Sequence, residues 1–199
     1  MFNEGGREMD KTKRIFIAVE LSDIVKEKLK EIQNVLYDSA LSIKWVEEEN
    51  FHITLKFLGE LKESELLEVK KNLIEVISDQ RSFEIGIDGL DAFPNLKHPK
   101  IIWAGIKKNK EKMVNLHEKI EARMVELGFE AEKHDYTPHI TLGRLRKSED
   151  DYGLIKEQIK DFPSALNMQE LVDKVTIMES ELTSEGPIYN AVARLDLKG

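Results

Sequence analysis

The chain has no cysteine among its 199 residues. This excludes disulfide bonds, thiolate nucleophiles and cysteine-based metal sites, and it suits the reducing cytoplasm, where we expect the protein to act. The sequence also lacks an apolar run long enough to span a bilayer, so we expect no membrane partner. The first residues are polar and lack the apolar stretch of a signal peptide, and we interpret residues 1–12 as a mobile leader.

Basic residues are also fewer than acidic ones. The 30 Lys and Arg residues are outnumbered by 38 Asp and Glu residues, which gives a formal net charge of −8. A chain with this balance does not bind nucleic acid through bulk charge, so any contact with RNA must come from a local basic patch. No linker rich in Gly, Ser or Pro divides the chain, which favours a single domain over residues 13–199.

Short strands and helices alternate along this domain and predict an α+β architecture. The expected strands are 14–20, 43–46, 50–58, 83–90, 101–106, 137–145, 171–179 and 188–197. The first expected helix begins after a capping Ser22. Three further helices are expected over residues 63–78, 110–127 and 152–160. The apolar stripes of the first two helices are assigned to Ile24, Leu29, Ile32, Val35 and Leu36, and to Leu66, Leu67, Val69, Leu73, Ile74 and Ile77.

The tetrapeptide His-Ile-Thr-Leu occurs twice, at residues 52–55 and 139–142. Each copy begins 38 residues after the start of an apolar strand, at residue 14 in the first half and residue 101 in the second. Self-similarity at a matched spacing indicates a duplicated unit. We therefore expect two pseudo-symmetric lobes that share one structure, with an active cleft between them.

Alternation along a strand places His52 with Thr54 on one face, and likewise His139 with Thr141. Histidine exchanges protons near neutral pH, and hydroxyls donate hydrogen bonds to phosphate oxygens. One histidine on each side of a phosphorus atom would supply the acid and the base of an in-line displacement. The alternative, that each motif is merely the polar face of a half-buried strand, does not explain why both copies keep both polar residues.

No zinc-ligand spacing accompanies either histidine, so we expect neither a metal nor a cofactor. Simple alternation places Lys56 on the cleft face. Arg144 reaches that face only if Gly143 carries a bulge; otherwise it is a surface arginine. The aromatic residues that could stack on a base are Phe57, Phe93 and Tyr136. His117 and Glu121, four residues apart on a helix, are interpreted as a surface pair.

Paired His-x-Thr-x motifs in a duplicated chain of this size resemble the two-histidine phosphoesterases. Among these, the RNA 2′,3′-cyclic phosphodiesterases, historically called 2′-5′ RNA ligases, are most similar. The resemblance covers roughly residues 14–197. Further segments that carry it are residues 14–20, Trp45-Val46, Phe57-Leu58-Gly59-Glu60, Phe93-Pro94, Trp103 with Gly105, Leu127-Gly128-Phe129, Tyr136-Thr137-Pro138 and Glu179-Ser180-Glu181-Leu182.

The resemblance implies two lobes, each with a small antiparallel sheet and flanking helices. It also implies hydrolysis of a terminal RNA 2′,3′-cyclic phosphate to a 2′-phosphate. By this analogy His52 is the acid and His139 the base, while Thr54, Thr141 and Arg144 hold the phosphate.

The implied partners are RNA ends or nucleotides that carry a cyclic phosphate, and we expect a monomer. Two other functions stay open. One is 2′-5′ joining of RNA ends at the same site, and the other is RNA or nucleotide binding without catalysis. The residues alone do not decide which histidine is the acid.

Overall fold

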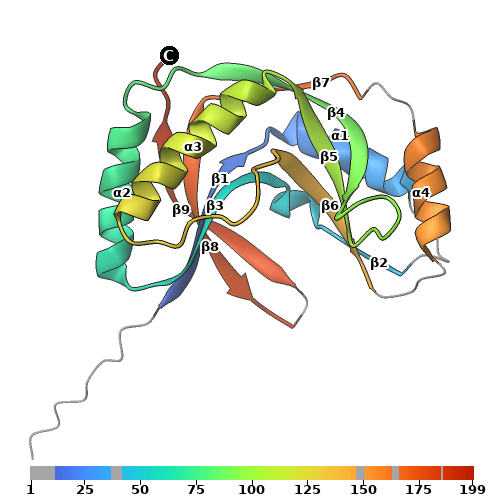
Figure 1. Ribbon diagram of the computed structural model, residues 1–199, viewed down its shortest axis with the longest axis horizontal. Helices are drawn as coiled ribbons and strands as arrows, with labels where there is room; N and C mark the ends of the chain where they lie inside the picture. The colour runs from blue at the N-terminus through green and yellow to red at the C-terminus, as the bar shows by residue number, and fades with distance from the viewer. Residues whose placement is uncertain (1–11, 37–41, 147–150, 163–165, 185) are drawn as a thin grey trace, which may run out of the picture.

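A single curved sheet runs through the whole molecule in the computed structural model (Figure 1). The structure describes residues 12–199 except 37–41, 147–150, 163–165 and 185, so residues 1–11 of the expected leader lie outside the described residues. The strands follow the order β7-β4-β5-β6-β3-β1-β8-β9, and β2 pairs with β6 beside this path.

The helices and strands alternate along the chain, as expected for an α+β fold. Their bounds are β1 Lys13–Glu20, α1 Asp23–Leu36, β2 Ile43–Trp45, the 3-10 turn η1 Glu48–Asn50, β3 His52–Leu61, α2 Glu63–Ile77, β4 Phe83–Phe93, β5 Ile101–Lys108, α3 Lys110–Glu126, β6 His139–Leu145, α4 Asp151–Asp161, β7 Met168–Val172, β8 Lys174–Leu182 and β9 Pro187–Asp196.

The two halves of the sheet meet where β3 pairs with β6, at Ile53 and Ile140. Both residues directly follow a motif histidine, so the pair lies on the pseudo-twofold axis that relates the lobes. The expected bilobal duplication is confirmed. The matched 38-residue spacing does not extend to the strand pairing, because His52 lies opposite Glu20 whereas His139 lies opposite Gly105. The residue opposite His52 lies six positions after the strand start at residue 14, and the residue opposite His139 lies four positions after the start at residue 101. Because this difference of two positions is even, each side chain keeps its face of the sheet.

Buried aliphatic residues on one face of the sheet join the helices in one large core, which includes Ile53, Leu142, Leu29 and Leu116. The opposite face carries a smaller cluster around Phe16, Ala18 and Met178. Since side chains alternate along a strand, burying Ile53 and Ile140 in the large core turns the motif histidines to the opposite, more open face.

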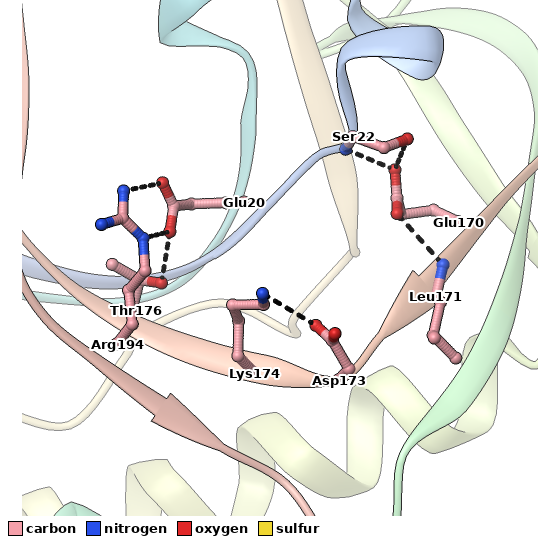
Figure 2. A network of polar contacts seen from close by, with 8 residues as sticks. All are labelled: Glu20, Ser22, Glu170, Leu171, Asp173, Lys174, Thr176 and Arg194. Carbon is pink, nitrogen blue, oxygen red and sulfur yellow. Dashed lines mark hydrogen bonds and ion pairs between the residues drawn. The ribbon is translucent and has the colours of Figure 1, made fainter.

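Helices α1 and α3 are exchanged between the two halves. Helix α1, from the first half, packs beneath the second half: Gln33 donates to the carbonyl of Leu142 in β6, and Ser22 at its start donates its N–H and hydroxyl to Glu170 in β7 (Figure 2). Ser22 was expected to cap α1, but its hydroxyl donates its hydrogen bond to Glu170 instead. Helix α3, from the second half, lies with α2 on the side of β1 and β3 (Figure 1).

Some expected boundaries and stripes are wrong. Strand β3 continues through Gly59, which has a positive φ of 80°, and the expected strand 171–179 is divided between β7 and β8. The buried stripe of α1 is Val25, Leu29, Ile32, Gln33 and Leu36. Ile24 and Val35 are exposed, and in α2 the same holds for Leu67 and Ile74, because each lies on the outer face of its helix.

Candidate functional site

The two motif histidines are held in the same way at the first residue of β3 and of β6. The Nδ1 of His52 lies 2.7 Å from the carbonyl oxygen of Asn50, and the Nδ1 of His139 lies 2.7 Å from that of Thr137. Because a carbonyl only accepts, each Nδ1 carries a hydrogen, and Nε2 is the nitrogen left to exchange a proton with a ligand. The Nε2 of His52 lies 3.1 Å from the Thr54 hydroxyl.

Aromatic rings enclose His52. Phe16 lies 5.0 Å from it between ring centroids, and Tyr189 meets it edge-on at 5.1 Å. Phe57, which is 60% exposed, extends this wall through its contact with Phe16. Neither Phe16 nor Tyr189 was expected in the site. Phe16 lies in an apolar run that indicated only a buried strand, and the sequence did not show that β1 pairs with both β3 and β8.

His139 has its own aromatic wall in the second lobe. Phe93 meets it edge-on with 4.9 Å between ring centroids and stacks on Trp103, which also contacts His139 at 5.8 Å. Thr141 lies directly opposite Trp103 in the sheet and so shares the face of His139. Phe93 was expected as a possible contact for a base, whereas Trp103 was noted only among the segments that resemble the family.

Burial lowers the pKa of both histidines. The pKa of His52 falls to about 4, because desolvation outweighs the stabilising bond to the Asn50 carbonyl and nearby positive charge on His139 and Lys26 adds to the effect. The pKa of His139 is also lowered, first by burial and then by the charge of Arg144, against the bond to Thr137. Both rings are therefore neutral near pH 7 without a ligand.

Each motif strand contains a bulge at the same place. In the pairing of β3 with β1, Leu55 has no partner between Thr54 and Lys56, and in the pairing of β6 with β5 the same is true of Leu142. A bulge adds one residue to a strand and reverses the faces of the residues that follow. The expected irregularity near Gly143 is therefore present, one residue earlier, and an equivalent one in the first motif was not foreseen.

The bulges explain two contrasting outcomes. Arg144 lies on the open face, where its charge acts on His139 and Tyr189. Lys56 was expected on that face as well, but its side chain is 1% exposed, and its ammonium group lies 2.7 Å from Glu121 and donates to the carbonyl of Glu130. This prediction was wrong because the bulge at Leu55 turns Lys56 toward α3 and brings Phe57 to the open face.

The partly buried Tyr136 and the buried His117 form a pair beneath the first motif. Their rings stack with 3.9 Å between centroids, the Tyr136 hydroxyl donates to the Thr54 carbonyl, and the Nδ1 of His117 donates to the Leu55 carbonyl. His117 is buried, so its interpretation as a surface residue was wrong. Burial raises the pKa of Tyr136, which stays neutral as a hydrogen-bond donor.

A cavity of about 640 Å³ opens between Thr54 in the first motif and His139 in the second. Its walls include Phe57, Phe93 and the ring of Tyr136, so it brings together the three aromatic residues expected to contact a base. The remaining lining residues come mainly from the segment before β6 and from the start of β5. They are Leu55, Lys56, Pro94, Lys100, Ile101, His117, Glu132, His134, Asp135 and Thr137.

A polar network borders the site beyond His52. Glu20, opposite His52 in the sheet, accepts two hydrogen bonds from Arg194 and one from Thr176 (Figure 2). The hydrogen bonds from Arg194 keep the pKa of Glu20 low despite partial burial. This network fixes β1, β8 and β9 together next to the histidine.

The described part of the chain contains no group of three or more His, Asp or Glu side chains placed to hold a metal ion. Among these same residues, no helix is long and apolar enough to cross a membrane.

A family model described as LigT-like phosphoesterase matches the chain twice, over residues 19–103 and 105–189. Each match contains one motif and its bulge. The RNA 2′,3′-cyclic phosphodiesterase of Methanothermobacter thermautotrophicus is 33% identical over 176 residues, which is 88% of this chain and 94% of that protein. The protein of the same name from Thermotoga maritima is 32% identical over 186 residues, 94% of this chain and 96% of its own.

Solved structures agree on the fold. E. coli LigT complexed with 3′-AMP superposes with a TM-score of 0.79 over 95% of this chain and 100% of its own, at 19% identity. The TT0787 protein of Thermus thermophilus gives 0.77 over 94% and 98%, at 25% identity. With two matches of the family model and relatives above 30% identity along most of its length, this chain belongs to the LigT-like phosphoesterase family.

Proposed function

We propose that this protein hydrolyses the terminal 2′,3′-cyclic phosphate of RNA to a 2′-phosphate. The observation that carries the proposal is the equivalent anchoring of His52 and His139, whose Nδ1 atoms are both held by a carbonyl two residues earlier. The curated relatives named RNA 2′,3′-cyclic phosphodiesterase support this choice of substrate.

In the proposed reaction, His139 removes a proton from water as the water oxygen bonds to phosphorus. The bond between phosphorus and the 3′ oxygen breaks, and His52 gives that oxygen its proton. The products are a 2′-phosphomonoester and a 3′ hydroxyl, and solvent returns the two histidines to their starting protonation states. Paired acid and base catalysis of this kind contributes roughly 10²–10⁴ in rate per group.

The remaining site residues bind the substrate in this proposal. Thr54 and Thr141 donate hydrogen bonds to the non-bridging phosphate oxygens, and Arg144 neutralises their charge. The nucleoside occupies the cavity beside His139, where Phe93 and Phe57 offer aromatic faces to the base.

His52 is neutral in the free protein, so the phosphate anion must raise its pKa before the ring can act as an acid. We assign the acid to His52 through the resemblance to the family, and end-group analysis tests the assignment. A short RNA ending in a 2′,3′-cyclic phosphate should yield a 2′-phosphate. A 3′-phosphate product would reverse the leaving group and refute the proposed mechanism.

The same assay in excess EDTA tests independence from metal ions. Activity should persist, and a loss that added metal restores would refute the proposal of a metal-free reaction. Including an RNA with a 5′ hydroxyl in the assay distinguishes water from a hydroxyl as the nucleophile, because joining would produce a longer RNA. Since one chain supplies both histidines, we also propose a monomer, which light scattering during size-exclusion chromatography would measure.

A further inference from the structure

The carbonyl at each bulge accepts a hydrogen bond from a buried side chain on the exchanged helix. His117 of α3 donates from Nδ1 to the carbonyl of Leu55 at 2.8 Å, and Gln33 of α1 donates from Nε2 to the carbonyl of Leu142 at 2.8 Å. His117 is 6% exposed and Gln33 is 2% exposed. The two contacts join residues 62 and 109 positions apart in the chain.

The extra residue at a bulge drops out of the regular ladder, so its carbonyl takes hydrogen bonds from elsewhere. The Leu55 carbonyl accepts from His117, and the Leu142 carbonyl accepts from Gln33 and also from the backbone N–H of Val46 at 2.9 Å. In a buried strand, an unpaired carbonyl is strongly disfavoured. The amide of Gln33 donates once to the Leu142 carbonyl and once to the carbonyl of Val46, at 2.8 Å. His117 is supported by stacking on Tyr136, whose hydroxyl binds the neighbouring carbonyl of Thr54.

The bulge decides which side chains face the substrate. With regular pairing, Lys56 would follow Thr54 on the open face, and Phe57 would turn into the core. In the second lobe, Gly143 would replace Arg144. The position of a bulge therefore sets both the chemistry of the cleft and the backbone from which each motif threonine projects.

We propose that His117 and Gln33 are positioning residues that hold the two bulges, His117 for Thr54 and Gln33 for Thr141. Neither side chain touches the phosphate in this arrangement. Each acts through the motif strand of the other half of the chain, so the two lobes contribute to each other's site. This inference rests on the proposed function only for its kinetic consequences.

Two substitutions of His117 separate the hydrogen bond from the stacking contact. His117→Phe keeps an aromatic ring against Tyr136 and removes the donor. His117→Asn removes the ring but keeps an amide N–H near the position of Nδ1. We expect kcat to fall about 10- to 100-fold in His117→Phe, because an error of about 1 Å in a catalytic group costs this much. The decrease in His117→Asn should be several-fold smaller. Equal kcat values in the two variants would overturn the proposal.

Double-mutant cycles show through which threonine each residue acts. His117→Phe should add little to the loss in Thr54→Val but should add its full effect to Thr141→Val. Gln33→Met, which removes the donor at similar volume, should show the opposite pattern. Full additivity of His117→Phe with Thr54→Val would overturn the proposal, because the two changes would then act independently.

A measurement without substrate distinguishes failure of this inference from failure of the proposed function. Lys56 is buried only while the bulge at Leu55 persists, so its amine should resist acetylation in the wild type and react in His117→Phe under native conditions. Gln33→Met is the matched control, because its lost bond lies in the other lobe and Lys56 should stay protected. Lys56 that stays protected in folded His117→Phe would overturn the proposal whatever the substrate is.

Discussion

Ile53 lies directly opposite Ile140 at the seam where β3 and β6 join the two halves of the sheet. Both side chains are fully buried, and each directly follows a motif histidine. The distance and angle between His52 and His139 therefore depend on how well these two aliphatic side chains pack.

We predict that Ile140→Ala lowers the free energy of unfolding by roughly 2–5 kcal/mol, because it leaves a cavity at this seam. Urea denaturation measures the change. Ile188→Ala is a suitable control, since Ile188 is half exposed in β9 and its truncation should cost less than about 0.5 kcal/mol. Equal costs for the two substitutions would contradict the role assigned to the seam.

Replacing either motif histidine should abolish most of the activity. We expect His52→Ala and His139→Ala each to lower kcat by roughly 10²–10⁴ while the circular dichroism spectrum is retained. His98→Ala serves as the control, because His98 is exposed in the loop between β4 and β5. An unchanged kcat in both motif variants would refute the roles proposed for the two histidines. Binding without catalysis would be supported instead if the wild type bound RNA without turnover and both variants bound it equally well.

The pKa of His52 makes a prediction about stability in acid. The folded-state pKa of about 4 lies below the value near 6.5 expected in the unfolded chain. The unfolded state therefore binds more protons between these values, and stability decreases as the pH falls from 6.5 toward 4. At pH 4 this effect of His52 should lower the free energy of unfolding by about 3 kcal/mol relative to neutral pH. His52→Gln should remove this part of the pH dependence in denaturation curves.

The same lowered pKa should rise again when phosphate binds. An anion bound between the two motifs favours the charged imidazole, so the pKa of His52 should increase when inorganic phosphate is added. Titration of the histidine ring signals by NMR measures the pKa with and without phosphate. An unchanged pKa at saturating phosphate would argue against a role for His52 as the acid.

Arg144 should contribute to phosphate affinity. A charge-assisted hydrogen bond to phosphate is worth about 1.5–3 kcal/mol, so Arg144→Gln should weaken binding of inorganic phosphate by roughly 10- to 150-fold. Arg146→Gln provides a control with the same change of charge two residues away, at another exposed arginine. Calorimetry compares the two, and a similar loss in both variants would indicate a general charge effect.

Lys56 should behave differently from Arg144, because its ammonium group is engaged by Glu121. We expect Lys56→Met to reduce the free energy of unfolding by roughly 1–3 kcal/mol through the unpaired carboxylate, without weakening phosphate binding. The double variant Lys56→Met/Glu121→Leu should recover part of the loss. A decrease in phosphate affinity as large as that of Arg144→Gln would place the Lys56 charge in the site after all.

The contrast between Lys56 and Arg144 shows how far the sequence could be interpreted. Alternation and repetition were sufficient to place His52, Thr54, His139 and Thr141 on one face, because these residues precede the bulges. Beyond the bulges, strict alternation failed. Gly143 marked an irregularity in the second motif, whereas no glycine or proline marks the bulge at Leu55.

His117 and Gln33 could not be identified from the sequence for a different reason. Each lies on a helix, and its partner is a backbone carbonyl in a distant strand, which has no signature of its own. Their burial depends on the exchange of α1 and α3 between the lobes. A local helical pattern gives no indication of this exchange, so His117 was interpreted as part of a surface pair with Glu121.

The exchanged helices also bear on how the two halves of the chain are related. One half alone would lack the helix whose side chain donates to the carbonyl at its own bulge, because His117 lies in the second half and Gln33 in the first. Two such halves could satisfy each other only by associating and trading helices. The present chain has the arrangement of a helix-swapped dimer within a single polypeptide, so the two similar half-sites depend on each other for their support.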